Sequence, residues 1–205
     1  MSRGRASATI IRWRWEIWPW MARYRRQAAD LWSVRRALTR LSTFGKSEAD
    51  MEGRRVSESI AEYSELALPN DANGLGNLLG GKIMHLVDLA GAIAAMKHCR
   101  NVVVTASVDH MDFIHPVKIG QWVRLRSSVN RAFRTSMEVG VKVWVEDLIL
   151  GGQQHVSSAF LTFVAIDAAG HGVPVPPIIA ETEDERRRYE EAGKRREYRL
   201  SLRRS

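Results

Sequence analysis

Apolar residues follow two different patterns along this chain, and each pattern predicts a type of secondary structure. Residues 81–99 (GKIMHLVDLAGAIAAMKHC) are apolar on almost every face at the helical period, which predicts one long, buried helix. Other segments are rich in β-branched residues or alternate apolar with polar residues, which predicts strands. The predicted strands are residues 57–68, 102–114, 122–133, 137–146 and 153–166.

The order of these elements predicts an α+β fold. Most of the strands are joined by short, turn-rich connections, and short connections favour antiparallel pairing because parallel strands need long crossovers. The apolar face of such a sheet needs a cover, and the 81–99 helix supplies it. Its small residues, among them Ala90, Gly91 and Ala94, let a curved antiparallel sheet wrap closely around the central helix.

The charge of the chain is unevenly distributed. Residues 1–50 hold 11 Lys and Arg against 4 Asp and Glu, whereas the remaining 155 residues hold 20 against 19. The body is therefore nearly neutral, which argues against a nucleic-acid-binding surface. The single cysteine, Cys99, excludes an intrachain disulfide and fits a cytoplasmic location. No apolar run reaches the roughly 18 residues of a membrane span.

Three segments divide the chain. Residues 1–50, with five tryptophans, fit either a segment for anionic membrane or RNA surfaces, or an extension upstream of a true start at Met51. We favour the extension, because the amino-acid composition becomes typical of a globular protein from Met51 onward. An organellar targeting peptide would also be rich in arginine, but five tryptophans are unusual in one. Residues 51–180 form the body. Residues 181–205 form a charged terminal helix and tail, for which we expect a solvated surface.

Asp88 is the main candidate for chemistry, because it is the one carboxylate within the apolar helix. An unpaired buried carboxylate is costly, so it is usually paired, protonated or functional. Its neighbours in sequence are apolar and offer no partner, which favours a catalytic role over pairing with a donor on the sheet. His85 lies one turn earlier as a possible supporting group. Asn73 lies in the preceding turn, and the preference of Asn for turns is the alternative to a functional role for it.

Other catalytic designs find little support. The stretch 76–82 (GNLLGGK) has the glycine and lysine spacing of a phosphate-binding loop, but Ile83 stands where a Ser or Thr is required. The chain has no G-x-S-x-G motif and no histidine pair at metal-ligand spacing, so we expect no metal. Asp109 and Asp112 are three apart, on opposite sides of a strand, and fit anchoring roles better than a carboxylate pair.

Four stretches together resemble the acyl-CoA thioester hydrolases of the hotdog fold, in particular the small bacterial enzymes and the brain-type and brown-fat-inducible hydrolases. They cover residues 57 to about 195, and the segment before Met51 has no counterpart. The stretches are PNDANGLGNLLGGKIMHLVDLAGAIAAMKHC, VTASVDHMDFIHPVKIGQWV, TSMEVGVKVWVED, and AFLTFVAID followed by VPVPPIIAETEDERRRYEE.

The resemblance implies a function and a site. The family's functional pair, an Asn before the central helix and an Asp within it, maps onto Asn73 and Asp88, contributed across a dimer interface. The resemblance also implies a double-hotdog dimer, commonly assembled as a trimer of dimers. CoA would lie near Gly80 and Gly81 and near the loop at residues 134–136, which holds Arg134, Thr135 and Ser136. CoA is part of the substrate, so no cofactor is expected.

The chemistry of a thioester suits this site. A thiolate whose conjugate acid has a pKa of roughly 8–9 leaves without a strong acid. We expect the N–H groups of Gly81 and Lys82 to bind the oxyanion at the helix start. Asp88 then acts as a general base on water, or attacks the thioester directly. Arg186 or Arg187 are further candidates for the CoA phosphates. The alternative function is an acyl-CoA-binding sensor without turnover.

Overall fold

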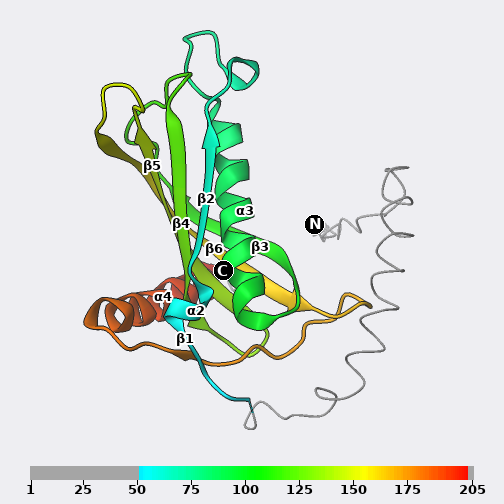
Figure 1. Cartoon of the computed structure of the whole chain (residues 1–205). Coiled ribbons are helices and arrows are strands. Elements are labelled where there is room, and N and C mark those ends of the chain that lie inside the picture. The colour runs from blue at the N-terminus through cyan, green and yellow to red at the C-terminus, as the bar shows by residue number, and fades with distance from the viewer. Residues whose placement is uncertain (1–50, 203–205) are drawn as a thin grey trace, which may run out of the picture. The chain divides into compact units, whose positions relative to one another are not determined.

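One long helix, α3 (Gly80–Cys99), lies along one face of a five-stranded sheet in the computed structural model, which describes residues 51–202 (Figure 1). The strands are β2 (Ala61–Leu66), β3 (Val102–Met111), β4 (Trp122–Ala132), β5 (Ser136–Glu146) and β6 (Gln153–Ile166). The basic, tryptophan-rich segment 1–50 falls outside the described residues.

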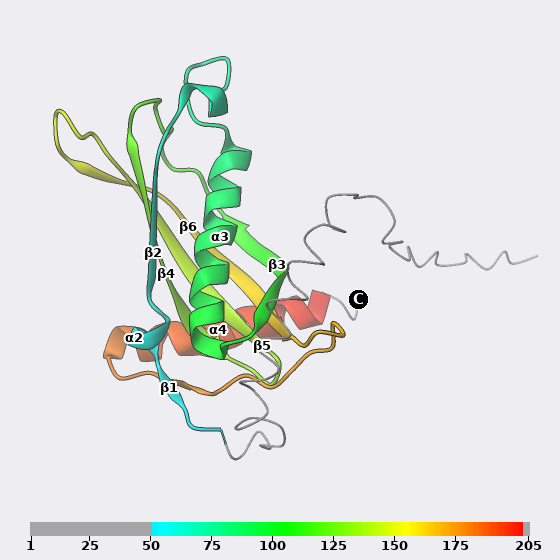
Figure 2. The same cartoon turned by 45° about the vertical axis from the view of Figure 1, so that its right-hand side comes forward.

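All pairs in this sheet are antiparallel, in the order β2-β4-β5-β6-β3. Strands β4, β5 and β6 form a meander, whereas the connection after β3 returns across the sheet, so β3 and β2 form its two edges. Figure 2 shows the sheet curving around α3. The predicted α+β arrangement of an antiparallel sheet around one helix is therefore confirmed, and it is the arrangement expected of a hotdog fold.

The core lies between α3 and the facing side of the sheet. Ile83, Leu86, Val87 and Ala94 of the helix are buried there, against β-branched and aromatic residues of the sheet. Gly91 is essential to the close approach, because a Cβ at this position would lie 2.9 Å from the Phe163 ring. The small residues of α3 thus allow the sheet to close over the helix, as the sequence predicts.

The opposite side of α3 corrects the expectation of a helix buried on every face. Met84, Leu89 and Met96 are 48%, 36% and 42% exposed in the single chain. These apolar residues form a stripe along the helix that the chain's own sheet does not cover. The apolar pattern of α3 therefore reflects two faces, one packed within the chain and one left uncovered by it.

Two predicted strands differ from the observed elements by more than one residue. The predicted strand 57–68 divides into a short helix, α2 (Val56–Ser59), and β2, because Ser59 Oγ donates to the Val56 carbonyl and accepts a hydrogen bond from Val129 N–H. The predicted strand 102–114 ends at Met111. A 3₁₀ turn, η2 (Pro69–Asp71), follows β2.

The terminal helix α4 (Glu183–Leu202) is not solvated on every side, contrary to the expectation from its charge. It crosses the face of the sheet away from α3 (Figure 2), and Arg195 binds the fully buried Glu138 of β5 at 2.7 Å. Arg199 pairs with Asp109 of β3, which has the anchoring role expected of it. Asp112 pairs with His110 at the exposed end of β3. A small parallel pair, β1 (Arg54–Arg55) and β7 (Ile178–Ile179), completes the fold.

Candidate active site

Asp88 lies on α3 between the exposed Met84 and Leu89, and within residues 51–202 its carboxylate has one hydrogen-bond partner. Thr105 of the edge strand β3 donates its hydroxyl hydrogen to Asp88 Oδ1 at 2.6 Å. The neighbours of Asp88 in sequence offer no partner, as expected, but the carboxylate does pair with a donor on the sheet, which is the alternative that the sequence did not favour. Sequence reasoning missed Thr105, although a hydroxyl within the run VVVTASV was a visible signal, because which strand faces α3 depends on the fold. Among the described residues, His85 donates no hydrogen bond to Asp88.

Asn73 organises the turn before α3. Its Oδ1 accepts hydrogen bonds from the N–H groups of Leu75, at 2.9 Å, and Asn77, at 3.1 Å. This is the side-chain-to-backbone bonding that favours Asn in turns. In the part of the chain that the structure describes, its Nδ2 donates no hydrogen bond. The side chain therefore holds the turn with its oxygen and keeps its two amide hydrogens for another group.

The start of α3 has one free amide and one engaged amide at the two predicted oxyanion positions. The Lys82 N–H donates to the Leu79 carbonyl at 3.0 Å, whereas the Gly81 N–H has no acceptor within residues 51–202. Gly81 is exposed, and no atom within 4 Å would meet a Cβ there. The geometry thus favours Gly81 over Lys82 as a donor, supported by the positive end of the helix dipole.

The Lys82 side chain has a structural role instead. Its Nζ lies 2.6 Å from Glu65 Oε1 and 3.3 Å from Asp71 Oδ2, which joins β2 and η2 to the first turn of α3. The hydrogen bond from Lys82 lowers the pKa of Glu65, and that to Glu65 raises the pKa of Lys82. This cluster holds the Asn73 turn against the helix start.

A single chain does not bring all the predicted site residues together. Asp88 lies eight residues after Gly80, about 12 Å along the helix axis. Residues 134–136 lie in the turn between β4 and β5 and at the first residue of β5, at the opposite end of the sheet from Gly80 and Gly81 (Figure 1). The eleven residues of β4 separate the two ends by roughly 30 Å.

The predicted CoA-contact loop packs partly against its own chain. Ser136 is buried, and its Oγ accepts a hydrogen bond from Arg196 of α4 at 3.1 Å. Thr135 packs against Gly172, whereas Arg134 is exposed. On α4, Arg187 is engaged by Asp184 and Glu191, and Arg186 donates to the Glu181 carbonyl. Within residues 51–202, Arg134 is thus the predicted phosphate ligand whose side chain is exposed and has no such partner.

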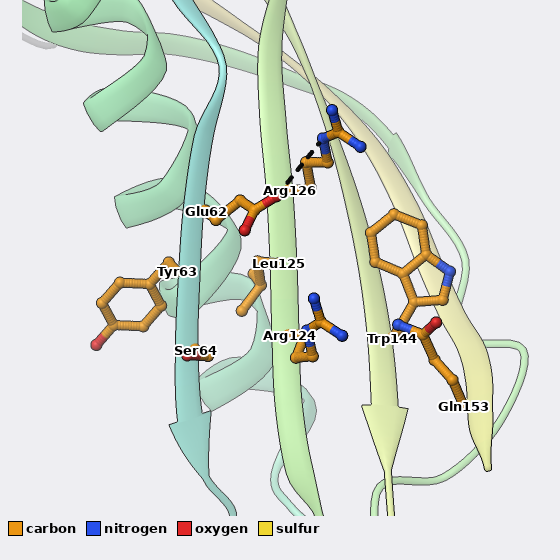
Figure 3. A pocket seen from close by; sticks show the side chains of 8 residues that line it. All are labelled: Glu62, Tyr63, Ser64, Arg124, Leu125, Arg126, Trp144 and Gln153. Carbon is orange, nitrogen blue, oxygen red and sulfur yellow. Dashed lines mark ion pairs between the residues drawn. The ribbon is translucent and has the colours of Figure 1, made fainter.

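A hollow of about 280 Å³ lies elsewhere, over β2, β4, β5 and the start of β6 (Figure 3). Its arginines already have carboxylate partners: Arg126 lies 3.8 Å from Glu62, and Arg124 lies 3.7 Å from Glu146. None of the predicted site residues lines it. Residues 51–202 contain no cluster of three or more His, Cys, Asp or Glu placed to hold a metal ion. Their helices include none long and apolar enough to cross a membrane.

Comparison with known proteins relates this geometry to one enzyme class. Residues 75–151 match the thioesterase superfamily. The chain is 42% identical over 134 residues to the uncharacterized acyl-CoA thioester hydrolase YkhA of Bacillus subtilis, a match that covers 65% of this chain and 78% of that protein. It is 37% identical over 152 residues to mouse acyl-coenzyme A thioesterase 11, covering 74% of this chain but a quarter of that longer protein.

Solved structures agree with the sequence comparison. A hexameric acyl-CoA thioesterase in its apo form superposes with a TM-score of 0.72 at 39% identity, covering 74% of this chain and 97% of that one. The acyl-CoA hydrolase of Staphylococcus aureus, in complex with butyryl-CoA, CoA and CoA disulfide, superposes with a TM-score of 0.69 at 34% identity. That match covers 74% of this chain and 93% of the other.

Proposed function

Because this chain belongs to the acyl-CoA thioester hydrolases of the thioesterase superfamily, we propose that Asp88 of one subunit and Asn73 of a second subunit hydrolyse the thioester of an acyl-CoA. The observation that carries the proposal is the placement of Asp88. Its carboxylate is held by Thr105 beside an apolar stripe and an open sheet edge, and both are surfaces that a second copy would cover.

The uncovered surface has the character of a subunit interface. Val102, Val104 and Val108 of β3 are 40%, 44% and 46% exposed, and β3 is the edge strand that contacts α3. Val108 lies on the face of the sheet that α3 covers, whereas Val102 and Val104 lie on the other face. An unpaired, apolar edge strand favours pairing with another strand. Antiparallel pairing of two β3 strands reverses the second subunit, so the start of its α3 comes toward the middle of the first. That reversal supplies the Asn73 that a single chain keeps away from Asp88.

Variants of the Staphylococcus aureus hydrolase support the same three residues. Structures of that enzyme carry alanine in place of an asparagine, an aspartate and a threonine. Its aspartate follows the asparagine by 15 residues, and its threonine follows the aspartate by 17. The same intervals separate Asn73, Asp88 and Thr105 in this chain. We assign to Thr105 the role of orienting the Asp88 carboxylate.

The reaction then follows from these groups. Asp88 takes a proton from a water molecule as that water attacks the thioester carbonyl carbon. The Gly81 N–H and the helix dipole stabilise the oxyanion, and the Asn73 amide orients the water or the carbonyl. Collapse of the tetrahedral intermediate breaks the C–S bond and releases the CoA thiolate and the carboxylic acid. The thiolate needs little assistance from an acid, since its conjugate acid has a pKa of roughly 8–9.

The decisive experiment measures free CoA thiol released from short, medium and long acyl-CoAs. Wild type is compared with Asp88→Asn, Asn73→Ala and the control Asp112→Asn, an exposed carboxylate paired with His110. We expect losses of about 10²–10⁴-fold for Asp88→Asn and a near-normal rate for the control. Near-normal turnover by correctly assembled Asp88→Asn would refute the proposed role of Asp88. Binding of CoA without turnover by wild type would favour the sensor function.

Subunit mixing tests whether the site is shared. Asp88→Asn and Asn73→Ala subunits, each inactive alone, are dissociated, mixed and reassembled. If the two residues come from different subunits, each mixed dimer contains one site with both residues intact. We therefore expect mixing to restore up to about half of the wild-type activity per mixed dimer. No recovery, despite proven mixed assemblies, would place Asn73 and Asp88 in the same subunit's site.

The assembly is proposed to be a trimer of such dimers in the cytoplasm. A hexameric thioesterase is among the structural neighbours, and a human relative is named as a cytosolic hydrolase. The mass of the native assembly tests the proposed trimer of dimers. A hexamer is expected, and a stable monomer would contradict both this assembly and the shared site.

A further inference from the structure

A lysine side chain stands in the first turn of α3, where its charge is unfavourable by itself. Lys82 is the third residue of the helix, and the positive end of a helix dipole repels a cation at that place. The sequence of this turn, GGKI at residues 80–83, contains no acid that could offset the charge. Two carboxylates from other elements offset it instead: Glu65 Oε1 of β2 lies 2.6 Å from Lys82 Nζ, and Asp71 Oδ2 of η2 lies 3.3 Å from it. The ammonium group thus joins three elements.

The three joined side chains are largely covered by the protein. Those of Lys82, Glu65 and Asp71 are 24%, 26% and 33% exposed, so salt screens their attraction less than it screens a fully exposed pair. Tyr63 donates its hydroxyl hydrogen to the second oxygen of Glu65 at 3.0 Å, which holds that carboxylate from the other side. The hydrogen bond with Lys82 lowers the pKa of Glu65, and the same bond raises the pKa of Lys82. Both groups therefore remain charged at neutral pH.

Asp71 lies at the junction between the two hydrogen-bond donors that the proposed reaction uses. Its carbonyl accepts the N–H of Leu79 at 2.9 Å, so the segment between these residues is a closed loop. Asn73 follows Asp71 by two residues, and Gly81 follows Leu79 by two residues. Each donor therefore extends from one side of the same junction. The Lys82 side chain spans this junction a second time, because it reaches from the first turn of α3 to the Asp71 carboxylate.

We propose that Lys82 is a positioning residue for acyl-CoA hydrolysis, because its ammonium group holds the Asn73 amide at a fixed place relative to the Gly81 N–H. The inference rests on the proposed function, in which these two donors contact the water or the thioester. One backbone hydrogen bond permits rotation about itself, whereas two links through different atoms do not. A donor misplaced by about 1 Å can cost a reaction roughly 100-fold in rate. Both donors belong to one subunit, and Asp88 comes from the other.

Steady-state hydrolysis of an acyl-CoA by the intact assembly tests this role. Lys82→Met removes the ammonium group and keeps the length of the side chain. Below the Tm of both proteins, we expect its kcat to fall about ten- to hundredfold, with KM changed less than about threefold. Lys82→Arg keeps a cation that can reach both carboxylates and should stay within a few-fold of wild type. Lys142→Met, at an exposed lysine of β5, is the control, with a normal rate expected. An unchanged kcat in Lys82→Met would overturn the inference.

Subunit mixing shows which half of the shared site Lys82 serves. Lys82→Met subunits are reassembled with Asp88→Asn subunits and, separately, with Asn73→Ala subunits. If Lys82 positions the Asn73 of its own chain, the mixture with Asp88→Asn contains one intact site per mixed dimer and exceeds the activity of both parents. The mixture with Asn73→Ala contains no intact site and should show no gain. The reverse pattern, or no gain in either mixture, would overturn the inference.

Hydrogen exchange at the Leu79 amide gives a readout that needs no turnover. We expect it to be about tenfold faster in Lys82→Met than in wild type and Lys82→Arg, because the junction opens more often. Unchanged exchange would show that Lys82 does not hold the junction. If wild type hydrolyses acyl-CoA and Lys82→Met does so equally fast, the inference is wrong and the hydrolase assignment stands. If wild type hydrolyses no acyl-CoA, the proposed function is wrong, and the exchange rate still decides whether Lys82 joins the three elements.

Discussion

The hydroxyl of Thr105 lies 2.6 Å from Asp88 Oδ1 and donates its hydrogen to it, which links the middle of α3 to the edge strand β3. The threonine fixes one carboxylate oxygen, and among the described residues the other oxygen, Oδ2, accepts no hydrogen bond, so it can contact water. The same contact ties the proposed catalytic group to the strand that a second subunit would pair with. We therefore expect the orientation of the Asp88 carboxylate to depend on the position of the edge strand β3.

Thr105→Val removes the hydrogen bond while it keeps the shape of the side chain. Because hydrogen bonds to charged groups contribute more than neutral ones, we expect kcat for acyl-CoA hydrolysis to fall about ten- to hundredfold. Thr105→Ser keeps the hydroxyl and should stay within a few-fold of wild type. Equal activity of the Val and Ser variants in steady-state assays would show that the contact does not orient the base.

Charges on the edge strand should separate the subunits. The double variant Val104→Lys with Val108→Lys places two ammonium groups on the exposed edge, and lysine on an edge strand opposes pairing. We expect the dissociation constant of the dimer to rise at least about hundredfold, with activity lost in parallel because Asn73 and Asp88 no longer meet. Sedimentation velocity measures the first effect. Ser64→Lys, on the opposite edge strand β2, is the control, and an unchanged assembly in the double variant would contradict a β3 interface.

Folding stability should decrease as the pH falls below neutrality, because of His98. This residue is fully buried; its Nε2 lies 2.8 Å from the Pro176 carbonyl, and its Nδ1 has no partner within residues 51–202. Burial lowers the pKa of His98 below its usual 6.5, an effect opposed by the Pro176 hydrogen bond. The unfolded chain therefore binds the proton first, so this stabilisation is complete above pH 6.5 and is lost as the pH falls through the lower pKa of the folded state.

For one such group, the free energy of unfolding changes by at most about 1.4 kcal/mol per pH unit. Chemical denaturation between pH 5 and pH 8 measures it. His98→Gln can still donate to the Pro176 carbonyl but does not titrate, so its stability should vary less with pH over this range. A variant with the same slope as wild type would assign the pH dependence to other groups.

Gly91→Ala should destabilise the core without touching the proposed site. The new methyl group would lie 2.9 Å from the Phe163 ring and 3.6 Å from Val141, both packed in the core. Overpacking of this kind costs about 1–3 kcal/mol, which lowers the Tm by roughly 3–10 °C. Gly81→Ala is the matched stability control in the same helix, because its methyl group meets no atom within 4 Å. Equal Tm values for the two variants would show that the core adapts to the added methyl group.

Periodicity located the elements well, because it depends on residues that are neighbours in the chain. Strand β6 spans residues 153–166, as its pattern predicts, and α3 begins within one residue of the predicted start. The pattern failed at residues 57–59, where a Ser59 side chain reaches the distant Val129 amide and stabilises a helical turn. That contact joins residues 70 positions apart, and no local pattern contains it.

The sequence by itself determined the α+β class, the apolar helix with Asp88 in its middle, and Asn73 in the turn before it. Only the tertiary structure decided that β3 crosses to the sheet edge and presents Thr105 to Asp88, and that the charged helix α4 packs on Glu138. It also decided that Asn73 and Asp88 lie apart within one chain. The reason is physical: backbone preference and apolar period act between neighbours in sequence, whereas strand order and ion pairing depend on surfaces that meet only after the chain has folded.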